Sequence, residues 1–379
     1  MNQKPKHYKI SSELRADITS GRYGSNSRLP SESQLVKTYG VSRPTAARAL
    51  LDLEKEGLIV RRPGSGTYVR SEPAMPATTR QIGLLVPGLE TTEIFSLICG
   101  EIASLCQAND YSLLWGGSSR PHDDTDSSQE HALEICNHFI ERKVSGVFFA
   151  PFELTTGQEK TNQQLLGLLT EVGIPVVLLD RDYFPYPRRS NFDLVGIDNF
   201  AAGFILAEHL LGLGCERLFF VARPLSAPTV NSRMAGVREA LTQNGIEPAP
   251  NWTCLGDPTD LKFVRSITSG NQADAFVCAN DFTAGKLMRS LEILKIRVPQ
   301  DARVVGFDDV KFSTLLTVPL TTIHQPCQDV ATVAFNAMLE RIARKSIPAR
   351  NLILTPTLVV RESCGAYMHR KTSTIKNAR

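Results

Sequence analysis

Residues 39–69 read YGVSRPTAARALLDLEKEGLIVRRPGSGTYV, and this stretch decides the fold of the first part of the chain. After a tight Gly40-Val41 turn, Ser42 can cap a helix that tolerates Pro44 in its first turn. Apolar residues at helical spacing predict the buried face of that helix: Ala46, Ala49, Leu50 and Leu53. The helix is expected to end at Gly57, and residues 58–69 predict a β-hairpin with a glycine-rich tip.

Two further helices are predicted upstream. Ile10, Leu14 and Ile18 recur every four residues, which is typical of a buried helix face. Ser31 and Gln34 have the spacing of a capping box, which predicts the start of a second helix. The first seventy or so residues therefore predict three helices followed by a hairpin.

This order of elements suits duplex DNA. The third predicted helix has the right width for a major groove, and its exposed start carries Arg43, Thr45 and Arg48, which can reach base edges or phosphates. The hairpin adds Arg61 and Arg62. The alternative is a small helical domain with charged faces, which the agreement of helix order, turn, hairpin and charge makes the weaker interpretation.

The motifs of this region closely resemble the DNA-binding domain of the GntR family over residues 8–69: LPSE at 29–32, YGVSRPT at 39–45, ALxxL at 49–53, EGLI at 56–59 and GSGTYV at 64–69. The resemblance implies a winged helix-turn-helix domain at 1–70. The expected DNA-binding residues are Ser31, Ser42, Arg43, Pro44, Thr45, Arg48, Arg61, Arg62, Gly64, Ser65 and Gly66. Ser33 and Ala47 stand where the family often has arginine, so the operator sequence stays open.

Composition predicts an ordinary globular protein of two or three domains, with 379 residues, 42% hydrophobic and 21% charged. Residues 1–72 hold 13 basic and 7 acidic residues, whereas the remainder holds 29 and 32, so only the first part is basic. The polar start has no secretory signal, and eight single cysteines without a CxxC pair predict reduced thiols. We therefore expect a cytoplasmic protein at the nucleoid, with no metal, no cofactor and no membrane partner.

The rest of the chain predicts an α/β domain. Residues 71–80 contain two prolines and predict a linker, and the polar residues 366–379 predict a tail. Between them, at 81–365, apolar runs alternate with helical patterns and predict two doubly wound parallel sheets, that is, two lobes. The predicted strands are 81–87, 111–115, 146–151, 174–180 and 194–198 in one set, and 217–222, 273–279, 303–308 and 320–323 in the other.

Polar residues that directly follow predicted strands mark a candidate ligand site, because ligands of open α/β sheets bind beyond the carboxyl ends of the strands. These residues are Asp180-Arg181-Asp182, Asn280-Asp281, Asp308-Asp309 and Gln325, joined by Arg233 near a helix start. Together they favour a hydroxyl-rich ligand. Structural alternatives remain open for each: a helix cap for Asn280 or Asp281, an ion pair for Asp180 with Arg181, and a turn contact for Gln325.

A second set of motifs resembles the effector domain of the LacI/GalR family, and thereby the periplasmic sugar-binding proteins, over roughly 80–363: IGLLVP at 82–87, IPVVLLDR at 174–181, VGIDN at 195–199, RxxG at 233–236, AND at 279–281, VGFDD at 305–309 and PLTTIxQ at 319–325. The resemblance implies effector contacts by Asp180, Arg233, Asn280, Asp308 and Gln325, to which we add Arg181. Residues 92–94 and Pro326-Cys327 depart from the family's aromatic positions, so Trp115, Phe152 and Phe184 are all candidates for a stacking surface. This hybrid layout resembles that of arabinose repressors.

The combined prediction is a homodimeric repressor of carbohydrate-utilisation genes that binds double-stranded operator DNA and is released by a mono- or oligosaccharide in the cleft. A purine or nucleoside effector, and a corepressor or activator mode, are alternatives. An enzyme fused to a DNA-binding domain is disfavoured, because the second part has no GxSxG, GxxxxGK[ST] or HExxH motif and no Schiff-base lysine with a phosphate cup.

Overall fold

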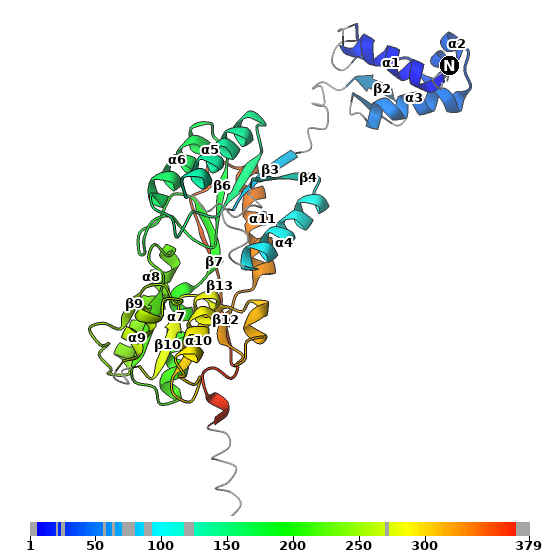
Figure 1. Cartoon of the computed structure of the whole chain (residues 1–379). Helices are drawn as coiled ribbons and strands as arrows, with labels where there is room; N and C mark the ends of the chain where they lie inside the picture. The colour runs from blue at the N-terminus through cyan, green and yellow to red at the C-terminus, as the bar shows by residue number, and fades with distance from the viewer. Residues whose placement is uncertain are drawn as a thin grey trace, which may run out of the picture. The chain divides into compact units, whose positions relative to one another are not determined.

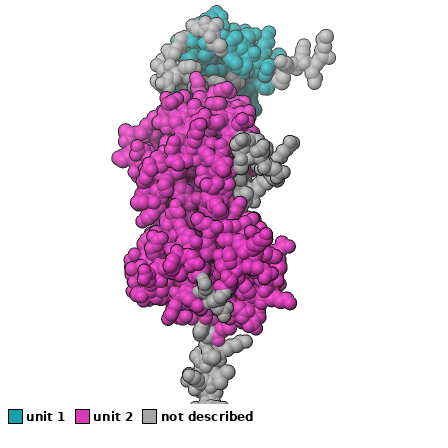
Figure 2. Space-filling view, turned by 60° about the vertical axis from the view of Figure 1, so that its left-hand side comes forward, with its two compact units in different colours: residues 1–80 teal, residues 81–379 magenta. Residues whose placement is uncertain are grey.

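The computed structural model describes residues 6–19, 22–23, 27–55, 58–62, 65–69, 80–86, 93–116, 125–269 and 273–368. The chain divides into two compact units, residues 1–80 and 81–379 (Figure 2). The predicted helix end at Gly57, Gly64 of the hairpin tip, the predicted linker before Arg80 and most of the predicted tail lie outside the described residues.

The first unit is three helices and a two-stranded sheet: α1 (Lys6–Thr19), α2 (Glu32–Tyr39), α3 (Arg43–Lys55), β1 (Ile59–Arg62) and β2 (Gly66–Val69) (Figure 1). β1 and β2 pair antiparallel, with Ile59 opposite Val69. The predicted capping box is confirmed: the Ser31 hydroxyl accepts from the Gln34 amide N at 3.3 Å, and the Gln34 side chain accepts from the Ser31 N at 2.8 Å. Both predicted apolar helix faces meet in one core with Leu29, Leu35, Ile59 and Val69.

The second unit has two lobes, each with a six-stranded sheet. The N-lobe sheet has the order β13-β7-β6-β5-β3-β4, and the C-lobe sheet has the order β14-β12-β11-β10-β8-β9. The N-lobe strands are β3 (Arg80–Leu85), β4 (Tyr111–Gly116), β5 (Gly146–Phe149), β6 (Val176–Leu179), β7 (Asp193–Ile197) and β13 (Asn351–Leu354). The C-lobe strands are β8 (Leu218–Ala222), β9 (Thr253–Leu255), β10 (Ala275–Cys278), β11 (Arg303–Asp308), β12 (Thr321–His324) and β14 (Thr357–Val359).

Helices cover both sheets, as the alternating pattern predicts (Figure 1). The N-lobe carries α4 (Glu93–Ala108), α5 (Thr125–Glu141), α6 (Gln158–Glu171) and α11 (Cys327–Ala343). The C-lobe carries α7 (Asn199–Gly212), α8 (Pro228–Gln243), α9 (Leu261–Thr268), α10 (Asp281–Ile293) and the short 3-10 helix η1 (Lys311–Thr314). The predicted α/β fold with two doubly wound lobes is confirmed, and each predicted strand overlaps an observed one.

Three short strands differ from the predicted set. β9, β13 and β14 were not predicted, because each is only three or four residues long and none has a fully buried apolar run. β13 pairs parallel with β7, whereas β14 pairs antiparallel with β12, so the C-lobe sheet is mixed. The chain therefore crosses between the lobes three times: after β7, after β12 and between β13 and β14.

α7 and α8 pack backbone against backbone. A Cβ added at Gly203 of α7 would lie 2.0 Å from the carbonyl oxygen of Arg233, and one added at Gly236 of α8 would lie 2.0 Å from that of Phe200. Only glycine permits so close an approach at these two positions. The contact fixes the position of Arg233, which lies one turn before Gly236.

Candidate functional site: a charged cluster between two lobes

Asp180 and Arg181 follow β6 at the end of the N-lobe sheet that faces the C-lobe. Both residues are 5% exposed. The Arg181 Nε donates to the Pro151 carbonyl at 2.8 Å, its Nη1 donates to Glu153 Oε1 at 2.6 Å, and its guanidinium lies 5.1 Å from the centre of the Phe95 ring. The nearest Asp180 oxygen is 3.5 Å from Arg181 Nη1. Arg181 is therefore held on one side by backbone and carboxylate and on another by an aromatic face.

Arg233 of α8 has a similar environment in the C-lobe. Its Nε donates to Asn199 Oδ1 at 2.7 Å, its Nη1 donates to the Ala279 carbonyl at 2.6 Å, and its guanidinium lies 4.5 Å from the centre of the Phe307 ring. Its Nη2 is 3.9 Å from Asp308 Oδ1. That same Asp308 oxygen accepts from Gln325 Nε2 at 2.7 Å.

The carboxyl groups of Asp180 and Asp308 interact with one another and with the arginines. Burial raises the pKa of Asp180, while the charges of Arg181 and Arg233 oppose the rise. Burial also raises the pKa of Asp308 to about 7, opposed by Arg233 and reinforced by the charge of Asp180. Residues of both lobes thus share one electrostatic site.

One buried oxygen of this site has no partner. Asp180 Oδ1 is inaccessible and accepts no hydrogen bond from any residue that the structure describes. An unsatisfied buried acceptor costs about 1–3 kcal/mol, and more when it is charged. A ligand that donates a hydrogen bond to Asp180 would remove this cost.

The two lobes touch around the cluster. Glu153 Oε2 accepts from the Ala227 amide N at the start of α8 at 2.9 Å, so this carboxylate joins Arg181 to the C-lobe. The Leu154 amide N donates to the Leu225 carbonyl at 2.7 Å, and Glu93 Oε2 accepts from the Lys311 amide N at 2.9 Å. The two lobes are therefore joined by direct hydrogen bonds around the cluster.

The predicted ligand residues have two kinds of environment. Asp180, Arg181, Arg233, Asp308 and Gln325 are buried, and Asp180, Arg233 and Asp308 interact across the two lobes. Asn280 caps α10, with its Oδ1 accepting from the Thr283 amide N at 2.8 Å, and its contact with an effector stays a prediction. Its neighbour Asp281 is fully buried and accepts from the Thr322 hydroxyl at 2.6 Å and from the Val310 amide N at 3.1 Å.

The aromatic candidates are dispersed. Trp115 of β4 is 54% exposed, Phe152 is buried, and Phe184 lines a cavity that Asp180 also lines. The rings that approach the charged cluster are instead Phe95 and Phe307. Sequence reasoning missed both because neither follows a strand: Phe95 is inside a helix, and Phe307 is one residue before the end of β11. Glu153 was also missed, although the strand-end rule applied to residues 151–153 would have found it.

In the first unit, the start of α3 presents the predicted DNA-contact side chains to solvent. The Arg43 side chain is 77% exposed and its Nε lies 3.4 Å from Glu32, whereas the Arg48 side chain is 57% exposed and lies 3.4 Å from Asp52. Ser42 and Pro44 are exposed too, and the Ser42 and Thr45 hydroxyls are 2.8 Å apart. Weak surface ion pairs of this kind exchange readily for phosphate contacts.

Arg61 of the hairpin contacts the helices of the first unit, and its contact with DNA stays a prediction. Its Nη2 donates to the Ala47 carbonyl of α3 at 3.2 Å and lies 3.5 Å from Glu32 of α2. These contacts attach the hairpin to both helices. The side chain of Arg62 is not among the described ones. At the hairpin tip, Ser65 bonds Tyr68 through the two hydroxyls at 2.8 Å. Gly66 has φ 126° and leaves space for Arg28, because a Cβ there would lie 2.8 Å from Arg28 Nε. Arg28 therefore lies beside the hairpin, which the sequence did not reveal.

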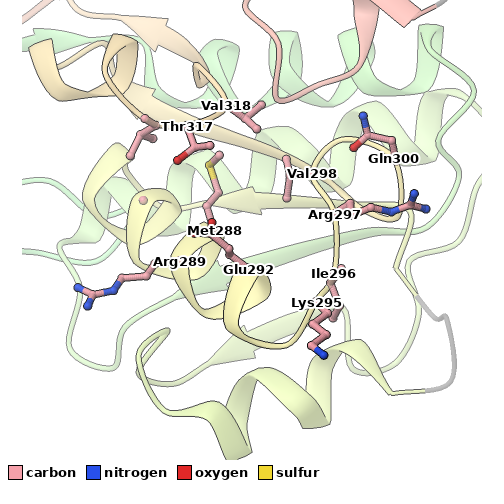
Figure 3. Close-up of a pocket in the computed structure, with 12 residues that line it drawn as sticks. Met288, Arg289, Glu292, Lys295, Ile296, Arg297, Val298, Gln300, Thr317 and Val318 are labelled. Atoms are coloured by element: carbon pink, nitrogen blue, oxygen red, sulfur yellow. The ribbon is translucent and has the colours of Figure 1, made fainter.

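A large cavity of about 540 Å³ lies on the C-lobe, away from the charged cluster. It is bounded by α10, the segment 295–300 and residues 316–318 (Figure 3). Its lining is largely apolar, with Met288, Ile296 and Val298, while Arg289 and Arg297 extend to opposite sides of it. It lacks the convergent polar groups of an effector site.

Two absences concern only the described part of the chain. No helix there combines the length and the apolar character needed to cross a membrane. No cluster of three His, Cys, Asp or Glu residues there has the arrangement of a metal site. All eight cysteines are free and buried.

Comparisons with known proteins agree with both units. Residues 7–69 match the gntR family of bacterial regulatory proteins, and residues 207–364 match the periplasmic binding protein-like domain. The arabinose metabolism transcriptional repressor of Geobacillus stearothermophilus is 27% identical over 372 residues, which cover 95% of this chain and 97% of that protein. The repressor PurR of Photorhabdus laumondii is 28% identical over 291 residues, which cover 75% and 80%. The structure of the regulator CelR with cellobiose superposes with a TM-score of 0.64 at 20% identity, covering 88% of this chain and 100% of that one.

Proposed function

The chain joins a DNA-binding domain of the gntR family to a periplasmic binding protein-like domain of the LacI/GalR type, and we propose that a carbohydrate releases this transcriptional repressor from its operator. The domains we propose are residues 1–70 for DNA binding, 71–80 as the linker, 81–365 for the effector and 366–379 as a tail. The relatives with known names are transcription regulators, which supports a regulatory rather than an enzymatic role.

The unsatisfied Asp180 oxygen is the observation that carries this proposal. A sugar hydroxyl both donates and accepts, so it can donate to Asp180 or Asp308 and accept from Arg181 or Arg233. Hydrogen bonds with one charged partner are roughly twice as strong as neutral ones. The names of two relatives, an arabinose repressor and a cellobiose-bound regulator, support the same ligand class.

A purine or nucleoside effector is the second candidate, favoured by the similarity to PurR. A base is usually recognised by stacking on an aromatic face in addition to hydrogen bonds. The two rings nearest the charged cluster, Phe95 and Phe307, already have the guanidinium groups of Arg181 and Arg233 over them. Their faces are therefore less available to a base than the charged groups are to a hydroxyl.

Closure of the lobes is the proposed link between ligand and DNA. Ligand that bridges Asp180 of the N-lobe and Asp308 of the C-lobe favours the closed arrangement, in which Glu153 meets Ala227. A ligand can shift an equilibrium only by its differential affinity for the two states, and DNA must weaken ligand binding by the same factor. Release by ligand is the mode we propose. A chain that binds chromosomal DNA works in the cytoplasm, at the nucleoid.

The proposed DNA-bound form is a homodimer on a two-fold symmetric operator. A C-lobe surface supports it: Leu316 and Val318 line the apolar cavity of Figure 3, and Leu315 and Ile293 beside it are 76% and 57% exposed. Contiguous exposed apolar groups on a globular protein mark an interaction site, and a second copy buries the same face on both partners.

The test starts from binding sites selected from random duplex DNA by the full chain. Fluorescence anisotropy on the selected duplex then reports release by a panel of pentoses, hexoses, oligosaccharides and nucleosides. Arg43→Ala should weaken duplex binding by on the order of 10- to 100-fold. Arg233→Ala should bind DNA normally but fail to respond to the sugar. The control Arg265→Ala, on the exposed face of α9, should bind DNA normally and still be released by the sugar. Release by nucleosides alone would refute the carbohydrate proposal, and a strictly monomeric complex would refute the dimer.

A further inference from the structure

A second cavity, of about 520 Å³, opens directly beside the charged cluster. Its lining includes Asp180, Asn199 and Ser232 on the side of the cluster, and Arg188, Arg189 and Thr229 elsewhere. Asn199 is the residue that holds Arg233 at 2.7 Å. The cavity therefore shares one wall with the proposed effector site and continues it toward the loop 182–190.

The loop 182–190 is built so that its two arginines face the cavity without an acidic partner. The Asp182 carboxylate accepts from the Tyr183 and Phe184 amides at 2.7 and 3.2 Å, and from the Ser190 amide and hydroxyl, both at 2.9 Å. Its acceptor capacity is used in shaping the loop. Arg188 lies 4.6 Å from the centre of the Phe184 ring, and neither Arg188 nor Arg189 forms an ion pair with any carboxylate that the structure describes.

The other charged groups of the lining are also accounted for. Asp198 caps α7, with its Oδ1 accepting from the Ala201 amide N at 2.9 Å. The 16-residue helix α8 begins at the cavity wall with Pro228 and Thr229, and its N-cap residue Ala227 supplies no side-chain cap. At this helix start the Ala227 amide N instead donates to Glu153 Oε2, at 2.9 Å. The lining thus places two arginines at the loop and three carboxylates, those of Asp180, Asp182 and Asp198, around it. Asp182 and Asp198 already accept hydrogen bonds from neighbouring amides, whereas Asp180 has an oxygen without a partner.

We propose that this cavity takes the anionic group of a polyhydroxylated effector, a phosphate or a carboxylate, at Arg188 and Arg189. The proposal rests on the proposed function, because the hydroxyl groups of the same molecule meet Asp180. Ligand cavities typically measure 300–1,000 Å³, so 520 Å³ accommodates a monosaccharide with one such group. Asp180, which has an oxygen without a partner, lines one end of the cavity, and the exposed guanidinium groups of Arg188 and Arg189 line the other, so one bifunctional ligand meets both ends. The effector is then an acidic sugar derivative rather than a neutral sugar.

Isothermal titration calorimetry with matched ligands tests this. The probes are a neutral hexose, the same hexose with one phosphate, the matching hexuronic acid, and inorganic phosphate alone. The wild-type chain is compared with Arg188→Gln plus Arg189→Gln, and with a control that removes two positive charges from α9, Lys262→Gln plus Arg265→Gln. We expect the loop variant to bind the acidic sugars on the order of 10- to 100-fold more weakly, and the α9 control to bind them like wild type.

The phosphorylated and carboxylated probes show whether the anionic group of the effector is a phosphate or a carboxylate. Tight binding of either probe, weakened in the loop variant, supports the inference. Tightest binding by the neutral hexose, unchanged in the loop variant, overturns it and leaves the carbohydrate-responsive repressor standing. Binding of inorganic phosphate as tight as that of the sugar phosphate overturns it as well, because the hydroxyls then contribute nothing. If no sugar binds, acidic or neutral, while nucleosides do bind, the proposed effector class itself is overturned.

Discussion

Substituting Gly236 by alanine tests whether the contact of α7 with α8 sets the position of Arg233. The added Cβ would lie 2.0 Å from the Phe200 carbonyl oxygen and 2.8 Å from the Phe204 N. Real Cβ atoms essentially never come closer than 3.0 Å to such atoms, so the two helices must separate by about 1 Å. Both obstructing atoms belong to backbone, which cannot turn away as a flexible side chain does.

The expected cost follows from this geometry. Overpacking a well-packed core costs about 1–3 kcal/mol, and because the backbone must yield here, we expect about 3 kcal/mol. Arg233 moves with α8, which stretches its 2.7 Å bond to Asn199. Effector binding should therefore be lost, while affinity for DNA without effector should stay unchanged because the first unit has its own core.

Urea unfolding measures the free energy, with a lower midpoint and an unchanged slope expected for Gly236→Ala. Calorimetry measures effector binding. The matched control is Gly167→Ala in α6, where a Cβ would meet nothing within 4 Å, and where alanine should stabilise by about 0.5–1 kcal/mol through helix propensity. A Gly236→Ala protein within about 0.5 kcal/mol of wild type, with normal effector binding, would refute the reasoning.

Three further predictions follow from the cluster and from the helix cap. Burial raises the pKa of Asp308 to about 7. Between about pH 4 and 7 the folded protein therefore binds a proton that the unfolded chain does not. The free energy of unfolding consequently falls as the pH rises through that window. Asp308→Asn should make the free energy of unfolding depend less on pH, as measured by urea titrations at pH 5, 6, 7 and 8. An unchanged pH dependence would contradict the assignment to Asp308. Each Glu153 oxygen accepts a hydrogen bond, and glutamine has only one oxygen, so Glu153→Gln should weaken effector binding by on the order of 10-fold in calorimetry. The control Glu171→Gln, at the exposed end of α6, should not. Equal effects of the two substitutions would show that Glu153 does not contribute to the contact between the lobes. Ser31→Ala should cost the first unit about 1 kcal/mol, seen as faster hydrogen exchange in α2, and Ser31→Asp should restore the protection if the lost cap is the cause.

The first unit was predictable because its signals are local. The Ser31 cap and the apolar spacing of α3 depend only on neighbours in sequence, and both elements are found where expected. The environments of Arg61 and Arg28 depend on how the hairpin packs against other segments. Arg61 therefore bonds to α3, and Arg28, which comes before the hairpin in sequence, lies beside Gly66.

The same distinction applies to the effector unit. Strand ends predicted Asp180 and Asp308 because parallel strands deliver their carboxyl ends to one edge of a sheet. The rule gives position but not hydrogen-bonding partners, so it could not separate Asp180, which has a free oxygen, from Asn280, which caps a helix. Phe307 lies under a guanidinium only because α8 of the same lobe brings Arg233 over β11, which residues near in sequence do not reveal.

Near its end the chain crosses to the N-lobe to form β13 and then back to the C-lobe to form β14. This order has a consequence for synthesis on the ribosome. β13 completes the edge of the N-lobe sheet beside β7, and β14 completes the edge of the C-lobe sheet beside β12. The N-lobe sheet therefore lacks a strand until residue 354 has been made, and the C-lobe sheet until residue 359. The core of the first unit, by contrast, is complete at Val69. A nascent chain thus carries a folded DNA-binding unit for nearly three hundred residues of translation before an effector can control it.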